Sequence, residues 1–135
     1  MTVLTDMTAF QAAALWGGLL SLLLVLFSIR VVLARQKHRV VLGDGGNSQV
    51  TVACRVFGNA TEYVPVGIGA LVLLSLLGLP VLAIHAVGGV LFAGRLLHAF
   101  GLNDKKPTMG RVGGMILTYL ALIAAGGMLV VHAFV

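Results

Sequence analysis

Long apolar runs alternate with short polar segments along the chain. The apolar runs cover about residues 10–34, 52–78, 80–101 and 110–133. Each is long enough for a helix to cross the hydrocarbon core of a bilayer, which takes about 20 residues. The pattern therefore predicts an all-α protein, an integral membrane four-helix bundle whose single domain takes in residues 1–135.

The polar segments between these runs predict how the helices are connected. GDGGNSQ, at residues 43–49, and NDKKPT, at residues 103–108, have the Gly, Asp, Asn and Pro content of loops. Only Gly78, Leu79 and Pro80 separate the second run from the third. We therefore expect a tight turn there, with the second and third helices forming an antiparallel hairpin.

Composition supports a membrane protein and excludes several other classes. Hydrophobic residues make up 59% of the chain and charged residues only 10%, far from the values of a soluble domain. Cys54 is the only cysteine, so neither an intrachain disulfide nor a cysteine metal cluster is expected. The histidine spacing suggests no metal site, and the basic residues form no domain or patch of the kind that binds nucleic acid.

The basic residues predict the orientation in the membrane. All nine are expected toward one side: Arg30, Arg35, Lys37, Arg39, Arg55, Arg95, Lys105, Lys106 and Arg111. By the positive-inside rule this side is cytoplasmic, and both termini lie outside. The same residues could also attract anionic lipid head groups. The first run lacks the basic flank of a signal peptide, so we expect its helix to be retained.

The stretch RVFGNATEYVP, residues 55–65, puts polar side chains at the start of the second helix. At 100° per residue, Arg55, Asn59 and Glu62 share one stripe, with Tyr63 beside it. Glu62 lies roughly 10 Å deeper in the membrane than Arg55, at 1.5 Å rise per residue. Facing lipid, a central charge costs about 2.5 to 3.5 kcal/mol. Glu62 must therefore face protein, a partner charge or a water-filled cavity.

Two explanations for this polar stripe remain open. Arg95 and His98 are three residues apart near the end of the third helix, and an ion pair between Glu62 and Arg95 could fix the register of the hairpin. Alternatively, the stripe belongs to a ligand site. One acid cannot neutralise Arg35, Arg55, Arg95 and Arg111 together, so a surplus of positive charge favours an anionic ligand.

RVFGNATEYVP resembles the signature of the MAPEG family, the membrane-associated proteins in eicosanoid and glutathione metabolism. The signature is Arg, three residues, Asn, two residues, Glu, an aromatic residue, one residue and Pro. Arg55, Asn59, Glu62, Tyr63 and Pro65 fill it. GDGGN before the second helix, LFAGRLLHAFGL at the end of the third and RVGGM at the start of the fourth are similar to the bacterial, mostly uncharacterised branch.

The resemblance implies a homotrimer that binds glutathione, with no metal, between neighbouring subunits at the cytoplasmic side. Arg55, Asn59, Glu62 and Tyr63 would contact the tripeptide from one subunit, and Arg35 would reach in from the next. Arg95 and His98 would line the same pocket. Arg111 matches the catalytic Arg that stabilises the glutathione thiolate in the family's transferases. A bacterial inner membrane is the expected location.

Three functions follow as hypotheses. The first is a glutathione transferase or peroxidase, in which the thiolate attacks a lipophilic electrophile or a lipid hydroperoxide that enters from the bilayer. The second is a non-catalytic lipid-binding or scaffold protein of the same fold. The third, a small channel or transporter, is disfavoured because no pair of broken helices lies near the midplane. Retention of Arg111 with the Arg55, Asn59 and Glu62 set favours the enzyme.

Overall fold

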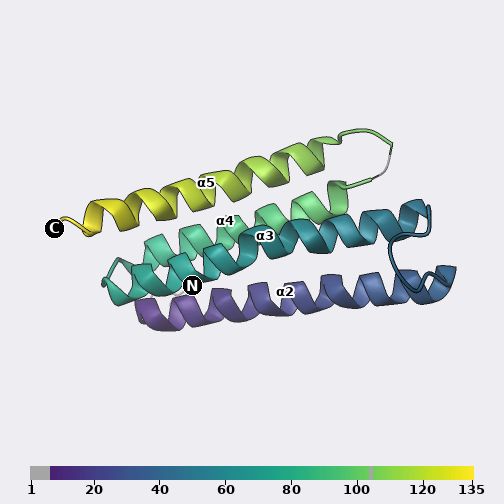
Figure 1. The fold of residues 1–135 in the computed structure, drawn as a ribbon. Coiled ribbons are helices and arrows are strands. Elements are labelled where there is room, and N and C mark those ends of the chain that lie inside the picture. The colour runs from purple at the N-terminus through teal and green to yellow at the C-terminus, as the bar shows by residue number, and fades with distance from the viewer. Residues whose placement is uncertain (1–6, 104) are drawn as a thin grey trace.

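Four long helices make up the structure, a computed structural model that describes residues 7–103 and 105–135. The helices are α2 (Ala9–His38), α3 (Ser48–Leu76), α4 (Val81–Gly101) and α5 (Met109–His132). They run alternately in opposite directions, so that α2 begins and α5 ends at the same end of the bundle (Figure 1). Within the described residues there is no strand, which confirms the predicted all-α class.

The helix ends differ from the predicted ones by up to four residues because side-chain caps, rather than hydropathy, determine them. α2 continues past residue 34 to His38, where Arg39 adopts the left-handed conformation (φ 56°) and ends the helix. α3 begins at Ser48 rather than at 52, because the Asn47 side chain accepts hydrogen bonds from the first free backbone N–H groups. Thr108 caps α5 in the same way.

The loop between α2 and α3 is fastened to the first turns of α3. Asp44 accepts a hydrogen bond from the Gly46 backbone N–H at 3.0 Å and another from the Thr51 hydroxyl at 2.9 Å. These two bonds hold the pKa of Asp44 below its ordinary value. The loop therefore has a fixed path into the helix that carries the polar stripe.

The helices pack as a layered arrangement rather than a closed square. α2 packs against α3 and α4, and α5 packs against α4 and α3. In Figure 1, α2 and α5 accordingly lie on opposite sides of the central helices. In the half of the bundle away from the two long loops, the Trp16 indole N–H donates a 3.0 Å hydrogen bond to His85 Nδ1 and so joins α2 to α4.

Glycines bring α4 and α5 into backbone contact near the end of the bundle that carries the two long loops. A Cβ added to Gly101 would overlap the backbone of Gly110, and one added to Gly114 would overlap the backbone of His98. Small residues allow this approach in a bilayer, where packing rather than exclusion of water drives helix association. The spacing of Gly110 and Gly114 thus serves a close crossing within one chain.

The outer surface of the bundle is suited to lipid. Large apolar side chains point outward along its length, among them Leu22, Leu82 and Ile123, which are 67%, 79% and 71% exposed. All four helices are long and apolar enough to cross a membrane. A soluble monomer would not expose apolar surface on this scale.

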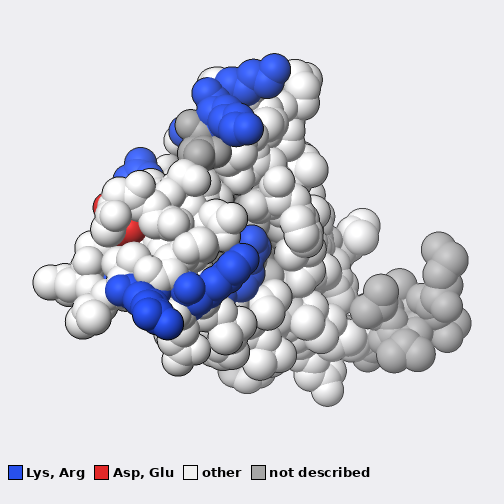
Figure 2. Space-filling view, turned by 90° about the vertical axis from the view of Figure 1, so that its right-hand side faces the viewer, with Lys and Arg blue, Asp and Glu red and all other residues white. Residues whose placement is uncertain are grey.

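Basic side chains gather at one end of the bundle. Figure 2 views the end at which α2 ends and α5 begins, and Lys and Arg side chains form several groups around it. All nine Lys and Arg residues of the chain lie in the helix halves nearest this end or in its two loops. We call it the basic end.

We predict that Gly114→Ala destabilises the bundle by about 1 to 3 kcal/mol, because the added methyl group forces apart two backbones already in contact. The midpoint of thermal unfolding in detergent measures the effect. Gly126→Ala is the control on the same helix, since a Cβ added to Gly126 would have no neighbouring atom within 4 Å. Equal midpoints for the two variants would contradict the close crossing.

Candidate functional site

Arg95 of α4 lies at the centre of the polar groups inside the bundle. Its side chain is 1% exposed. The guanidinium donates hydrogen bonds to Asn59 Oδ1 of α3 at 3.0 Å and to Thr118 Oγ1 of α5 at 3.2 Å. It also lies 5.4 Å from the centre of the Tyr63 ring, within the range of a cation–π interaction. One buried cation therefore joins three helices.

Thr118 is held in position to accept from Arg95. Its side chain is fully buried, and its hydroxyl donates to the Gly114 carbonyl at 2.8 Å. Since the hydroxyl proton is used there, an oxygen lone pair is left for the guanidinium. Met115, on the same side of α5, brings its sulfur to 3.7 Å from Arg95 Nη1.

Tyr63 and Tyr119 form an aromatic pair beside this cation. Their ring centres are 5.9 Å apart in an edge-on arrangement, and their hydroxyl oxygens are 3.4 Å apart. The pair joins α3 to α5 on the same level as Arg95. Tyr63 thus meets the cation with its ring and a second helix with its hydroxyl.

An ion pair between Glu62 and Arg95, the first of the two explanations for the polar stripe, does not form within the described chain. Within the described residues Arg95 has no carboxylate within salt-bridge distance, and its partners are the neutral oxygens of Asn59 and Thr118. Glu62 is exposed at the surface of α3, whereas the guanidinium is buried between α3 and α5. Arg95 therefore carries a buried positive charge that this part of the chain solvates with dipoles but does not neutralise.

Glu62 instead borders a small hollow on the exposed surface of α3. The hollow has a volume of about 110 Å³ and is lined by Cys54, Arg55, Gly58, Asn59 and Glu62. The predicted stripe of Arg55, Asn59 and Glu62 is thus present as a surface with both signs of charge. Asn59 connects it to the interior, since the same side chain lines the hollow and accepts from Arg95.

Arg35 reaches the edge of this hollow from α2. One guanidinium nitrogen lies 3.7 Å from Cys54 Sγ, and the other donates to the Val41 carbonyl at 3.3 Å. A second hollow, of about 380 Å³, surrounds Arg35 together with other residues at the end of α2. Within one chain, therefore, Arg35 already lies next to the stripe, on its Cys54 side.

His98 and Arg111 lie closer to the basic end. His98 is 3% exposed, packs against the backbone of α5, and its buried Nδ1 has no partner among the described residues. Arg111 is exposed, and its backbone N–H is capped by Thr108 Oγ1 at 3.1 Å. It is one helical turn, roughly 6 Å, from Met115 on the same face of α5. Arg111 is thus near the Arg95 cluster but outside it.

The sequence analysis missed three residues of this cluster, namely Met115, Thr118 and Tyr119. Arg111, Met115 and Thr118 recur at four and three residues and so share one face of α5. This periodicity is the signal that could have found them. It lay in an apolar stretch where a threonine or methionine usually means packing. Among the described residues no group of three or more His, Cys, Asp or Glu side chains could hold a metal ion.

Fold and site together define a class, a multi-pass all-helical membrane protein with a cationic polar site toward one end. The chain belongs to the MAPEG family, whose family model matches residues 13–131, and this confirms the predicted resemblance. It is 40% identical over 113 residues to Inner membrane protein YecN of Escherichia coli (strain K12), an alignment that covers 84% of this chain and 86% of the relative. A protein of the same name from Escherichia coli O6:H1 (strain CFT073) matches equally. No solved structure gives a significant match.

We predict that Thr118→Val destabilises the protein by about 1 to 3 kcal/mol, because the buried guanidinium loses an acceptor while the side-chain volume is kept. Thr118→Ser keeps the hydroxyl and should retain most of the stability. Thermal unfolding of both variants in detergent tests the order. A valine variant as stable as the native protein would show that Arg95 does not depend on this bond.

Proposed function

We propose that the protein is a membrane-embedded thiol transferase or peroxidase that binds glutathione, or a similar thiol, at the hollow beside Arg95. The observation that carries the proposal is the buried Arg95 guanidinium, whose only partners in the described chain are uncharged. An anion that entered from the hollow would supply the charge that this cation lacks. Membership of the MAPEG family supports a thiol as that anion.

The charges around the hollow suit glutathione. The tripeptide has two carboxylates, one ammonium group and a thiol. Arg55 lines the hollow and Arg35 contacts its Cys54 edge, so that both could bind the carboxylates, and Glu62 is the acid that lines it, suited to the ammonium group. Asn59 and Tyr63 add neutral polar contacts on the Arg95 side. Paired opposite charges on a partly desolvated surface give both affinity and orientation.

The proposed chemistry depends on a thiolate. A free thiol has a pKa of about 8.5, and a nearby cation favours the thiolate. We assign this role to Arg111, which lies on the face of α5 that leads to Met115 and Thr118. The thiolate sulfur would bond to an electrophilic carbon. In a substitution the electron pair of the broken bond leaves with the leaving group, and in an addition the π electron pair moves to the neighbouring atom. With a hydroperoxide, two thiols would give a disulfide, an alcohol and water.

Assembly of copies is proposed from the exposure of the charged stripe. Arg55 and Glu62 are exposed on a helix that is apolar enough to span a membrane. A charge at this depth is costly against lipid, and another protein surface would cover it. A second copy of the chain meets that need, and the resemblance implies three copies. His98 would then line a pocket completed between subunits.

The location is proposed on two grounds. The basic end carries all nine Lys and Arg residues, which by the positive-inside rule makes it cytoplasmic, with both termini on the outer side. The relatives are named inner membrane proteins. We therefore infer a bacterial inner membrane, with the thiol site open to the cytoplasm and the lipophilic substrate entering from the bilayer.

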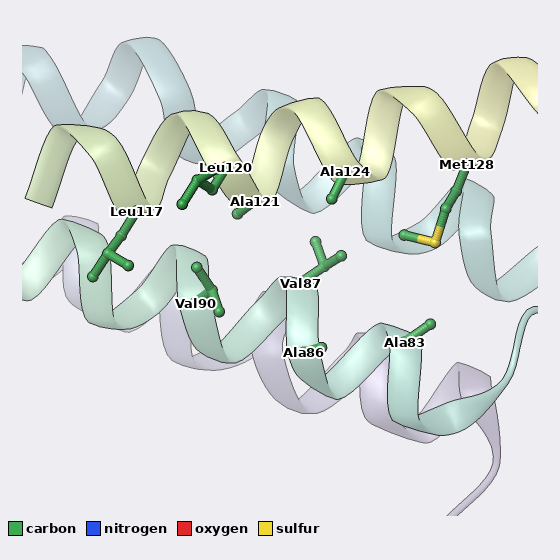
Figure 3. A pocket seen from close by; sticks show the side chains of 9 residues that line it. All are labelled: Ala83, Ala86, Val87, Val90, Leu117, Leu120, Ala121, Ala124 and Met128. Atoms are coloured by element: carbon green, nitrogen blue, oxygen red, sulfur yellow. The ribbon is translucent and has the colours of Figure 1, made fainter.

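A non-catalytic lipid-binding or scaffold protein is the second candidate, and it rests on one apolar groove. α4 and α5 diverge away from their glycine crossing and leave a groove of about 550 Å³ between them. In Figure 3 its side chains face each other from the two helices, and all of them are apolar: Ala83, Ala86, Val87, Val90, Leu117, Leu120, Ala121, Ala124 and Met128. The groove has room for a lipid chain but no group for chemistry.

Titration with glutathione separates the two candidates. We predict that the purified protein in detergent raises the thiolate absorbance of added glutathione at neutral pH. Arg111→Ala should keep binding but lose this signal, and the transferase rate with a lipophilic aryl halide should fall about 100-fold. Lys106→Ala removes a cation from the adjacent loop and should change neither. No binding at millimolar glutathione would overturn the thiol site and leave the scaffold.

The oligomer provides a separate test. We predict a mass of three copies for the detergent-solubilised protein, after correction for bound detergent. Glu62→Gln should leave this mass unchanged and weaken glutathione binding about tenfold, through loss of one charge-assisted hydrogen bond. A monomeric native protein would contradict the proposal that another copy of the chain covers the charged stripe. Dissociation of the Glu62→Gln variant would mean that Glu62 chiefly joins subunits.

A further inference from the structure

A third hollow lies at the basic end, between α2, the first turns of α3 and the end of α4. Its volume is about 330 Å³, and it is lined by Arg30, Ser48, Gln49, Val52, Leu102 and Asn103. It shares no lining residue with the hollow that holds Arg55, Asn59 and Glu62. An inference about it therefore stands apart from the proposed thiol site.

The Gln49 side chain lines this hollow and has amide N–H groups that can donate to it. Asn47 Oδ1 is occupied by the backbone N–H groups of Gln49 and Val50, so the Asn47 amide nitrogen must face His38 Nδ1, at 3.1 Å. His38 Nδ1 is then an acceptor, and its Nε2–H donates to Gln49 Oε1 at 2.9 Å. Because its oxygen is used, the Gln49 amide has N–H groups left to offer.

The Asn103 side chain also lines the hollow, and its oxygen is likewise used by other bonds. Its Oδ1 accepts the backbone N–H groups of Lys105 and Lys106 at 2.9 and 3.1 Å. The amide N–H groups remain. Arg30 has only donors, and the Ser48 hydroxyl can donate as well. Four polar side chains from three segments line this hollow and can each donate a hydrogen bond. An anion-binding site needs such a set of donors.

The remaining walls set the kind of anion. Val52 and Leu102 are apolar and half-buried, and they form the apolar part of the lining. Arg30 is eight residues before the end of α2, roughly 12 Å along the helix, and so belongs to the membrane interface rather than to the water-exposed loops. A hollow with a cation, amide donors and an apolar wall at this depth matches a phosphate group attached to lipid chains.

We propose that this hollow binds a phosphate ester, with Arg30 as the charged contact and Ser48, Gln49 and Asn103 as hydrogen-bond donors. At this depth the headgroup phosphate of a membrane phospholipid is one source of such a group, and a soluble phosphate ester from the cytoplasmic side is the other. Bound there, the phosphate would connect α2, α3 and the loop before α5 at the end of the bundle where the thiol site opens.

The test compares probes with and without a phosphate group and with and without lipid chains. Purified protein in detergent is titrated with dioctanoyl phosphatidylglycerol, with dioctanoylglycerol, which lacks the phosphate, and with glycerol 3-phosphate, which lacks the chains. The midpoint of thermal unfolding reports binding. We expect phosphatidylglycerol to raise the midpoint and dioctanoylglycerol not to do so. A midpoint raised by glycerol 3-phosphate as well would assign the site to a soluble phosphate ester.

Variants identify the hollow. Arg30→Gln should weaken the apparent affinity for phosphatidylglycerol about tenfold, the loss expected for one charge-assisted hydrogen bond, and Arg30→Lys should restore most of it. Lys37→Gln removes another cation of α2 that does not line the hollow and should leave the affinity unchanged. Equal stabilisation by lipids with and without phosphate, or equal losses in Arg30→Gln and Lys37→Gln, would overturn the proposal.

Discussion

The buried guanidinium of Arg95 is the constraint on which the polar interior of the bundle depends. It is removed from water almost completely, yet the described chain gives it only amide, hydroxyl, sulfur and aromatic partners. A cation in such a setting is tolerated when dipoles surround it from several directions. Those dipoles come from α3 and α5, so the charge on α4 fixes the mutual register of three helices. The same lack of a charged partner is the basis on which an anion is proposed to bind there.

Close packing of α4 against α5 makes this arrangement possible. The glycines at 101, 110 and 114 bring the two backbones together, and the Gly114 carbonyl takes the hydroxyl proton of Thr118. A larger residue at 114 would therefore change both the distance between the helices and the orientation of an acceptor of Arg95. Gly114 thus has two roles in one turn of α5, because it permits the close approach to α4 and its carbonyl orients the Thr118 hydroxyl.

Sequence reasoning predicted the features that are local or periodic. The four spans, the clustering of basic residues and the common face of Arg55, Asn59 and Glu62 follow from spacing alone. The helix ends could not be obtained from hydropathy, since Asn47 and Arg39 set them through capping. The partners of Arg95 could not be obtained either, since charge complementarity suggested Glu62 and gave no reason to consider the neutral side chains of Asn59 and Thr118. The actual choice depends on the direction in which the side chain leaves α4, and that direction is a property of the packed bundle.

The layered arrangement of helices has a consequence for how the molecule comes apart. The Arg95 cluster joins α3, α4 and α5 but includes no residue of α2, which is attached through Trp16, Arg35, His38 and its apolar contacts. The contacts that retain α2 are mainly apolar ones with α3 and α4, in the same core that the other helices share. Local opening need not involve every joint between helices at once. A substitution in the Arg95 cluster therefore weakens the joints among α3, α4 and α5 more directly than it weakens the joint between α2 and α3.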